Sequence, residues 1–139
     1  MAKDIYHFLV RQALEKDGWL ITHDPYVLRR VGKRSREVDL GAEKFIAAER
    51  GMERIAVEVK SFVGSSFVYE FNAAFGQYAI YKFFLNQKEP ERKLFLAVPE
   101  MVFEKEFAAP DIVEICLEFE VQLFVFNTDN ATIVKWIGK

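Results

Sequence analysis

The segment that most constrains the fold is residues 54–60, RIAVEVK, where β-branched and charged residues alternate. A period of two places successive side chains on opposite faces of a β-strand. With Val57 and Val59 in a core, Glu58 and Lys60 share the other face, about 6–7 Å apart along the chain. Charged groups on a buried strand are costly unless something pairs them. We therefore expect a central strand whose end carries a paired or functional charge cluster.

The rest of the chain predicts helices interleaved with strands. Helices are expected over residues 4–16, 67–86, 100–107 and 111–119, and strands over 19–22, 38–40, 93–98, 121–127 and 132–137. Such interleaving indicates an α/β sandwich around one mixed sheet. We see no internal repeat and no linker, so we expect a single domain over residues 1–139.

Residues 42–49, AEKFIAAE, allow two conformations. A tight hairpin at Gly51-Met52 would place Glu58 opposite Phe45. Asp39 can face Glu58 only if residues 42–49 form an excursion such as two helical turns. Because the composition favours helix, we expect the excursion, with Asp39 at the end of a strand beside Glu58.

Asp39, Glu58 and Lys60 then form a candidate Mg²⁺ site. Carboxylate oxygens are hard ligands, and Mg²⁺ keeps several waters and a phosphate in its octahedron. A lysine beside it can orient or deprotonate the attacking water, while the metal stabilises charge on the phosphate. The tripeptide acid-x-Lys occurs twice, at residues 58–60 and 91–93, but only the first lies in a predicted strand. A structural ion-pair cluster without catalysis is the alternative.

Charge is unevenly distributed, although the net charge is only −2. One run holds five bases and no acid: Arg29, Arg30, Lys33, Arg34 and Arg36. Residues 100–120 hold seven acids and one base. A polyanion such as DNA would meet the first region and avoid the second. A solvated loop is the alternative interpretation of the basic run.

Several classes of protein have no support in the sequence. One cysteine, Cys116, and two histidines exclude a disulfide framework and a four-ligand zinc site. There is no P-loop, no G-x-G-x-x-G and no G-x-S-x-G motif. The chain lacks a signal-peptide pattern and an apolar run long enough for a bilayer, so we expect a cytoplasmic protein without a membrane span.

The order of Asp39, Glu58-x-Lys60 on the next strand and Gln77-x-x-x-Tyr81 on the following helix resembles the PD-(D/E)XK nuclease superfamily, in its RecB-like variant. The resemblance implies a restriction endonuclease-like three-layer sandwich, with a central mixed β-sheet flanked by helices. It also implies that Asp39 and Glu58 bind Mg²⁺ or Mn²⁺, and that Lys60 acts on the attacking water. Gln77 and Tyr81 would help to position DNA and the site. Packing of Tyr81 on the sheet is the alternative.

Many members of that superfamily carry an acid on the first helix, and the nearest residue here is His7. Histidine is a poor replacement for a carboxylate at Mg²⁺. His7 is therefore a supporting candidate of the site. The alternative is a histidine hydrogen-bonded to a carboxylate.

A second resemblance covers nearly the whole chain. Five segments are similar to the XisH family: KDGWLITHDP, VDLGAEKFIAAERG, IAVEVKSF, FGQYAIY and IVKWI. This resemblance implies an excision-controlling factor of the cyanobacterial fdxN element, acting with a site-specific recombinase and a second controlling factor, XisI.

Three functions stay open. The chain is a Mg²⁺-dependent DNA endonuclease, a catalytically inactive nuclease-fold module that binds DNA or XisI, or a purely protein–protein adaptor. The basic run favours the first two functions over the third. The 14 phenylalanines in so short a chain favour a homodimer.

Overall fold

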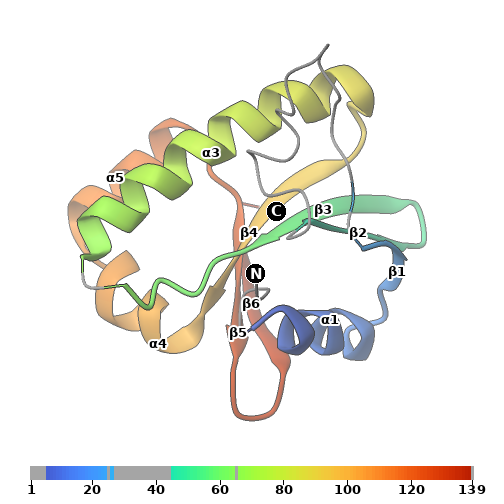
Figure 1. The fold of residues 1–139 in the computed structure, drawn as a ribbon, viewed down its shortest axis with the longest axis horizontal. Helices are drawn as coiled ribbons and strands as arrows, with labels where there is room; N and C mark the ends of the chain where they lie inside the picture. Colours follow the sequence, from blue (N-terminus) through green and yellow to red (C-terminus); the bar gives the residue numbers. More distant parts are fainter. Residues whose placement is uncertain (1–5, 25, 27–44, 65, 139) are drawn as a thin grey trace.

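The computed structural model describes residues 6–24, 26, 45–64 and 66–138 (Figure 1). Eleven helical and strand segments follow one another in this part of the chain. They are α1 (His7–Lys16), β1 (Leu20–His23), β2 (Phe45–Arg50), β3 (Glu53–Val59), α3 (Phe67–Lys88), β4 (Lys93–Pro99), α4 (Glu100–Val102), the π-helical η2 (Phe103–Phe107), α5 (Pro110–Glu118), β5 (Leu123–Asn127) and β6 (Thr132–Ile137). Within these ranges no helix is long and apolar enough to cross a membrane.

The described strands form one mixed sheet in the order β1-β2-β3-β4-β5-β6. The pairs β3–β4 and β4–β5 are parallel, and the remaining neighbours are antiparallel. Parallel neighbours need crossover connections, which are usually helical. Here α3 connects β3 to β4, and α4, η2 and α5 connect β4 to β5. The expected α/β class with a mixed sheet is confirmed.

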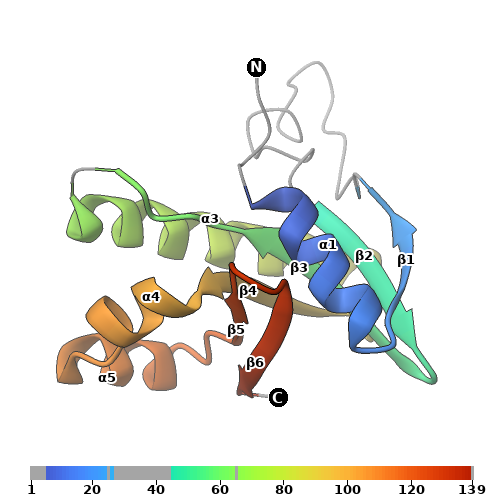
Figure 2. The same ribbon diagram turned by 90° about the horizontal axis from the view of Figure 1, so that it is seen from below.

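Helices cover both faces of the sheet, as Figures 1 and 2 show. On one face, α1 contributes Val10 and Leu14 to a core that contains Val57 and Val59 of β3. On the other face, α3 packs against β2, β3 and β4, while η2 and α5 pack against the β4–β5 region. The alternation predicted for β3 is therefore realised, because its valines face α1 and Glu58 points to the α3 face.

The expected helix over residues 42–49 is wrong. Phe45–Arg50 is strand β2, and it pairs with β3 so that Phe45 lies opposite Glu58. The chain turns at Gly51, whose φ of +61° suits glycine. Burial of Ile46 and its two following alanines in the sheet outweighs the helix propensity of this composition. Asp39 and the expected strand over residues 38–40 lie outside the described residues.

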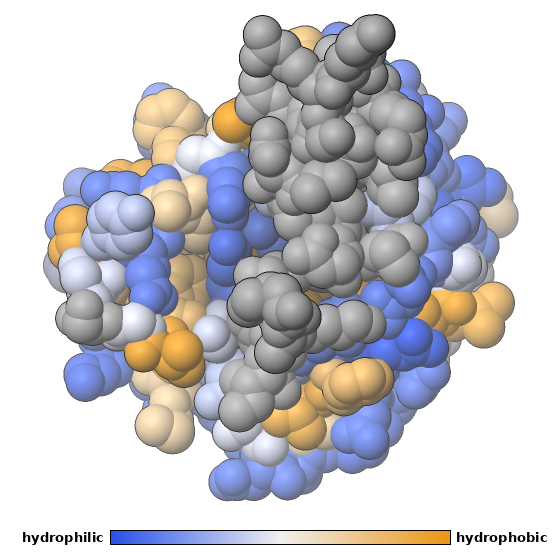
Figure 3. All heavy atoms as spheres, viewed as in Figure 1, coloured by the Kyte–Doolittle hydropathy of each residue, from blue (hydrophilic) through white to orange (hydrophobic). Residues whose placement is uncertain are grey.

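The long helix begins and runs as expected. Ser66 caps α3 with its side-chain oxygen, which accepts a hydrogen bond of 3.2 Å from the backbone N–H of Tyr69. Hydrophobic side chains reach the surface over α3 and α4, between hydrophilic ones (Figure 3). Exposed hydrophobic residues on these helices include Val68 on α3, which is 67% exposed, and Met101 on α4, which is 77% exposed.

A buried arginine connects the end of α3 to the strands. The Arg92 guanidinium donates hydrogen bonds to the carbonyls of Ile55, at 2.9 Å, and Ala48, at 3.4 Å. Its Nε also donates to Glu89 at 2.8 Å, and the Tyr26 hydroxyl donates to the same carboxylate at 2.7 Å. The hydrogen bonds from Arg92 and Tyr26 lower the pKa of Glu89 from 4.5 to about 2.

We predict that Glu89→Gln lowers the free energy of unfolding at pH 7 by about 2 kcal/mol, because Arg92 loses its buried charge partner. The folded-state pKa of Glu89 lies below 4.5, so the stabilisation is complete above that pH and is lost as the pH falls toward 2. Urea unfolding between pH 7 and about pH 3 should therefore show a flatter pH dependence for the variant than for wild type. The exposed neighbour Glu91→Gln is the matched control, and equal effects of the two substitutions would contradict the prediction.

Candidate functional site

The structure places Glu58 and Lys60 together at the carboxyl end of β3. Glu58 is 2% exposed and lies between Phe45 of β2 and Leu96 of β4 in the sheet register. The Lys60 Nζ lies 3.6 Å from the Glu58 Oε2, with the lysine side chain 20% exposed. The Lys60 N–H donates to the Ala97 carbonyl at 3.2 Å, which continues the β3–β4 pairing beyond β3. The ammonium thus reaches solvent while the carboxylate stays in the interior.

A cleft lies just beyond this pair. Its volume is about 470 Å³, and its lining comes from the segments that follow β3 and β4, from the starts of α1 and α3, and from the β5–β6 turn. After β3 the lining begins at Ser61, the residue after Lys60, and it includes neither Glu58 nor Lys60. Polar groups that line it include Ser61, Lys105 and Thr128. Ligands of open α/β sheets bind outside the carboxyl ends of the parallel strands, which is the position of this cleft.

The backbone after Lys60 is strained. Phe62 has a φ of +55°, a conformation that bulky side chains rarely adopt. Its ring is held by contacts with Phe67 and Phe107, with ring centroids 5.5 Å away in both cases. Aromatic packing therefore holds Phe62, two residues after Lys60, in this strained backbone conformation.

Gln77 and Tyr81 lie on the face of α3 that packs on the sheet. Tyr81 is 1% exposed and belongs to a core that contains Ala56 and Leu94. The Oε1 of Gln77 is buried and accepts no hydrogen bond from the residues that the structure describes. The packing expected as the alternative for Tyr81 is present, and a role for either residue at the site remains a prediction.

His7 is fully buried at the start of α1, which covers the opposite face of the sheet from Glu58. Its Nε2 donates to the Asp24 carboxylate, with distances of 3.0 and 2.9 Å to the two oxygens. The Arg11 guanidinium donates to the same carboxylate at 2.7 Å. The alternative expected for His7, a hydrogen bond to a carboxylate, is therefore present. The sequence did not indicate that Asp24 is the partner or that Arg11, four residues away on the same helix face, shares it.

The other predicted site residues cannot be placed. Asp39 and the basic residues Arg29, Arg30, Lys33, Arg34 and Arg36 lie outside the described residues. Within the described ranges, no group of three or more His, Cys, Asp and Glu side chains could hold a metal ion. Glu58 fits one part of a Mg²⁺ site, since such sites use one or two carboxylates and complete the octahedron with water and phosphate.

Comparison with known proteins decides the family. The sequence model of the XisH protein family matches residues 1–134. The chain belongs to the XisH family. No curated protein matches it.

Two crystal structures share the fold of this XisH chain along its length. An XisH family protein from Nostoc punctiforme PCC 73102 is 40% identical, with a TM-score of 0.85, and the alignment covers 96% of this chain and 99% of that one. An fdxN element excision controlling factor protein from Anabaena variabilis is 39% identical, with a TM-score of 0.85 and coverage of 97% and 99%. The XisH resemblance stated from the sequence is thereby confirmed.

We predict that Lys60→Met destabilises the fold by about 1 kcal/mol, because the buried Glu58 loses its ion-pair partner. The double variant Glu58→Leu/Lys60→Met should recover most of that loss, since apolar side chains suit the interior of a sheet. Urea unfolding at pH 7 measures both effects, with the exposed Lys93→Met on β4 as the matched control. A double variant far less stable than Lys60→Met would contradict the prediction, because it would show that Glu58 stabilises the fold through contacts other than Lys60.

Proposed function

We propose that this chain is an fdxN element excision controlling factor that processes DNA at a nuclease-like, Mg²⁺-dependent site at the carboxyl end of β3. The observation that carries the proposal is the buried Glu58 carboxylate paired with the Lys60 ammonium beside a cleft. Helices on both faces of a mixed sheet agree with a restriction endonuclease-like sandwich. The relative from Anabaena variabilis bears the name of that controlling factor.

Each residue of the site has a distinct role in this proposal. Asp39 and Glu58 bind Mg²⁺, or Mn²⁺ in its place, and Lys60 holds the attacking water. The metal, when bound, stabilises negative charge on the phosphate and on the leaving oxygen. Gln77, with its buried amide oxygen, and Tyr81 support the site from α3. His7 stands on the first helix where many PD-(D/E)XK enzymes carry an acid.

DNA is the proposed substrate, and the basic run from Arg29 to Arg36 is its proposed phosphate-binding region. An XisI-like controlling factor and a site-specific recombinase are the proposed protein partners, and a homodimer is the proposed assembly. These partners follow from the family rather than from any contact of the described residues.

The second candidate function is a catalytically inactive nuclease-fold module that binds DNA or a partner. The geometry of His7 favours it, because its Nε2 is engaged by Asp24 and its imidazole offers no carboxylate to a metal. Both candidates use the same fold and differ in whether the Glu58 site cleaves a phosphodiester.

We expect Mg²⁺- or Mn²⁺-dependent cleavage of plasmid or branched DNA, and a loss of about 100-fold or more in Glu58→Ala and Lys60→Ala. The second acid-x-Lys tripeptide provides matched controls, since Glu91→Ala and Lys93→Ala should keep the activity. Circular dichroism and thermal unfolding verify that the variants fold. No cleavage with either metal, or cleavage that both site variants retain, would reject the enzyme and favour the binding module.

We expect the double variant Arg30→Ala/Arg34→Ala to weaken DNA binding. If each arginine contacts one phosphate, the slope of log affinity against log salt should fall by about 0.9 per lost contact on duplex DNA. Fluorescence anisotropy with a labelled duplex at several salt concentrations measures this slope. Lys88→Ala/Lys93→Ala carries the same charge change outside the run and is the control. Equal slopes for the two double variants would show that Arg30 and Arg34 do not contact the DNA phosphates.

A further inference from the structure

Helix α5 is amphipathic, yet none of its nine residues is buried. Ile112, Ile115 and Cys116 pack partly against the core under the helix. Val113 is 41% exposed and Leu117 is 71% exposed. A helix with an exposed apolar stripe has a face that nothing in the described chain covers.

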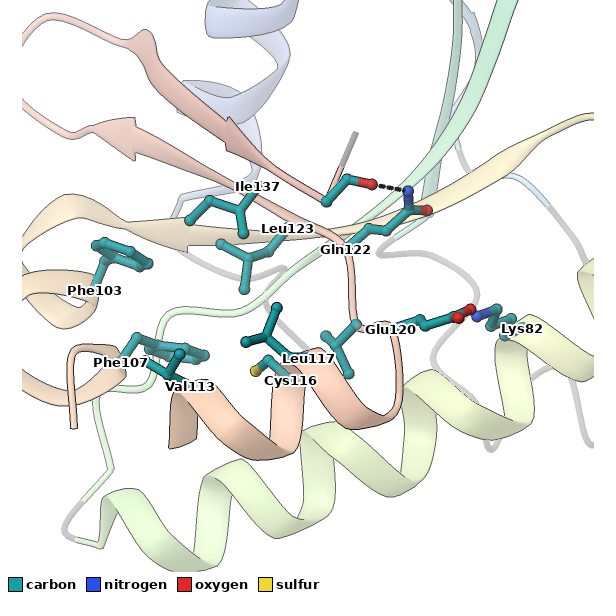
Figure 4. A pocket seen from close by; sticks show the side chains of 12 residues that line it. Lys82, Phe103, Phe107, Val113, Cys116, Leu117, Glu120, Gln122, Leu123 and Ile137 are labelled. Carbon is teal, nitrogen blue, oxygen red and sulfur yellow. Dashed lines mark hydrogen bonds between the residues drawn. The ribbon is translucent and has the colours of Figure 1, made fainter. Parts of the chain in front are cut away.

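That stripe forms one wall of an open groove of about 500 Å³ (Figure 4). Figure 4 shows Leu117 and Val113 facing Leu123 and Ile137 across the groove, with Phe103 and Phe107 at one end. At the other end Glu120 and Lys82 point toward one another. Gln122 donates a hydrogen bond to the Gly138 carbonyl and closes this side of the groove.

The apolar surface continues from the groove along α3. A smaller cleft beside it shares Lys82 and is lined by Phe83 and Phe119 among others. Phe83 is 56% exposed and Phe119 is 57% exposed. Contiguous exposed apolar patches of this kind mark interaction sites on soluble proteins.

The side of the groove that η2 and α5 form is acidic, while Lys82 of α3 lies at one end of the groove. Between residues 104 and 120 there are six acids and one base, Lys105. The acids are Glu104, Glu106, Asp111, Glu114, Glu118 and Glu120, and all but the half-buried Glu106 are exposed. A second copy of the chain placed face to face on the groove would bring like charges together, which opposes such a contact. An occupant with the opposite charge gains on-rate and specificity instead.

We infer that the α5 groove binds an apolar segment of a protein partner whose flanks carry Lys and Arg. The apolar side chains fill the space between Leu117 and Ile137, and the basic flanks lie over the glutamates of α5. The groove shares no residue with the Glu58–Lys60 pair, so this binding goes beyond the proposed function and is independent of DNA cleavage.

Two synthetic helical peptides test this surface. Both carry leucines at i, i+3, i+4 and i+7, one with Lys and Arg on the flanks and one with Glu at the same positions. The basic peptide should bind the full chain at least tenfold more tightly than the acidic peptide in fluorescence anisotropy. Binding should also slow the reaction of Cys116, the one cysteine of the chain, with a thiol reagent, because Cys116 lines the groove.

Leu117→Glu should weaken binding of the basic peptide at least tenfold, since it places a charge in the apolar contact. Met52→Glu, at a 98% exposed position in the β2–β3 turn, should bind as wild type. Glu114→Lys/Glu118→Lys leaves the apolar stripe intact and should reverse the preference between the two peptides. Failure of the basic peptide to bind, equal binding of both peptides, or wild-type binding by Leu117→Glu would overturn the inference. Self-association that Leu117→Glu abolishes, measured by sedimentation, would overturn it in favour of a second copy.

Discussion

The register between β2 and β3 determines on which face of the sheet each buried side chain lies. A slip of one residue would turn Val57 and Val59 away from α1 and place Glu58 in that core. Arg92 opposes such a slip, because its guanidinium binds the carbonyls of Ala48 and Ile55, which are partners in the register. Glu89 neutralises this buried arginine from the end of α3, so one ion pair connects the hairpin to the helix that covers it.

Most of the fold could be predicted because local pattern and burial agree. The alternation in residues 54–60 and the apolar run over 93–98 each indicate the strand that is found. The segment before Gly51 could not be predicted in this way, since its alanines and glutamate favour helix while its neighbours in the sheet bury it. The hairpin pairing that places Phe45 opposite Glu58 follows from the turn position, and tertiary burial decides between the two alternatives.

The candidate site shows what one sequence can and cannot predict. Glu58 and Lys60 are close in sequence, so strand periodicity alone places them on one face. The hydrogen bonds of His7 to Asp24 and of Arg92 to the carbonyls of Ala48 and Ile55 join residues 17 or more positions apart in the chain, and no local pattern indicates them. Phe45, and not Asp39, lies opposite Glu58 on β2, because the pairing register is fixed by the turn at Gly51.

The uneven charge of the chain has a consequence for how its surfaces can be used. DNA is a polyanion, so the acidic residues around the α5 groove repel it and the basic run attracts it. A basic protein segment is repelled by the basic run and attracted by the acidic residues beside the groove. The net charge of −2 therefore hides a basic run and an acidic segment that favour partners of opposite charge. As proposed, DNA binds through the basic run and the protein partner through the groove, so the two partners do not compete for the same residues.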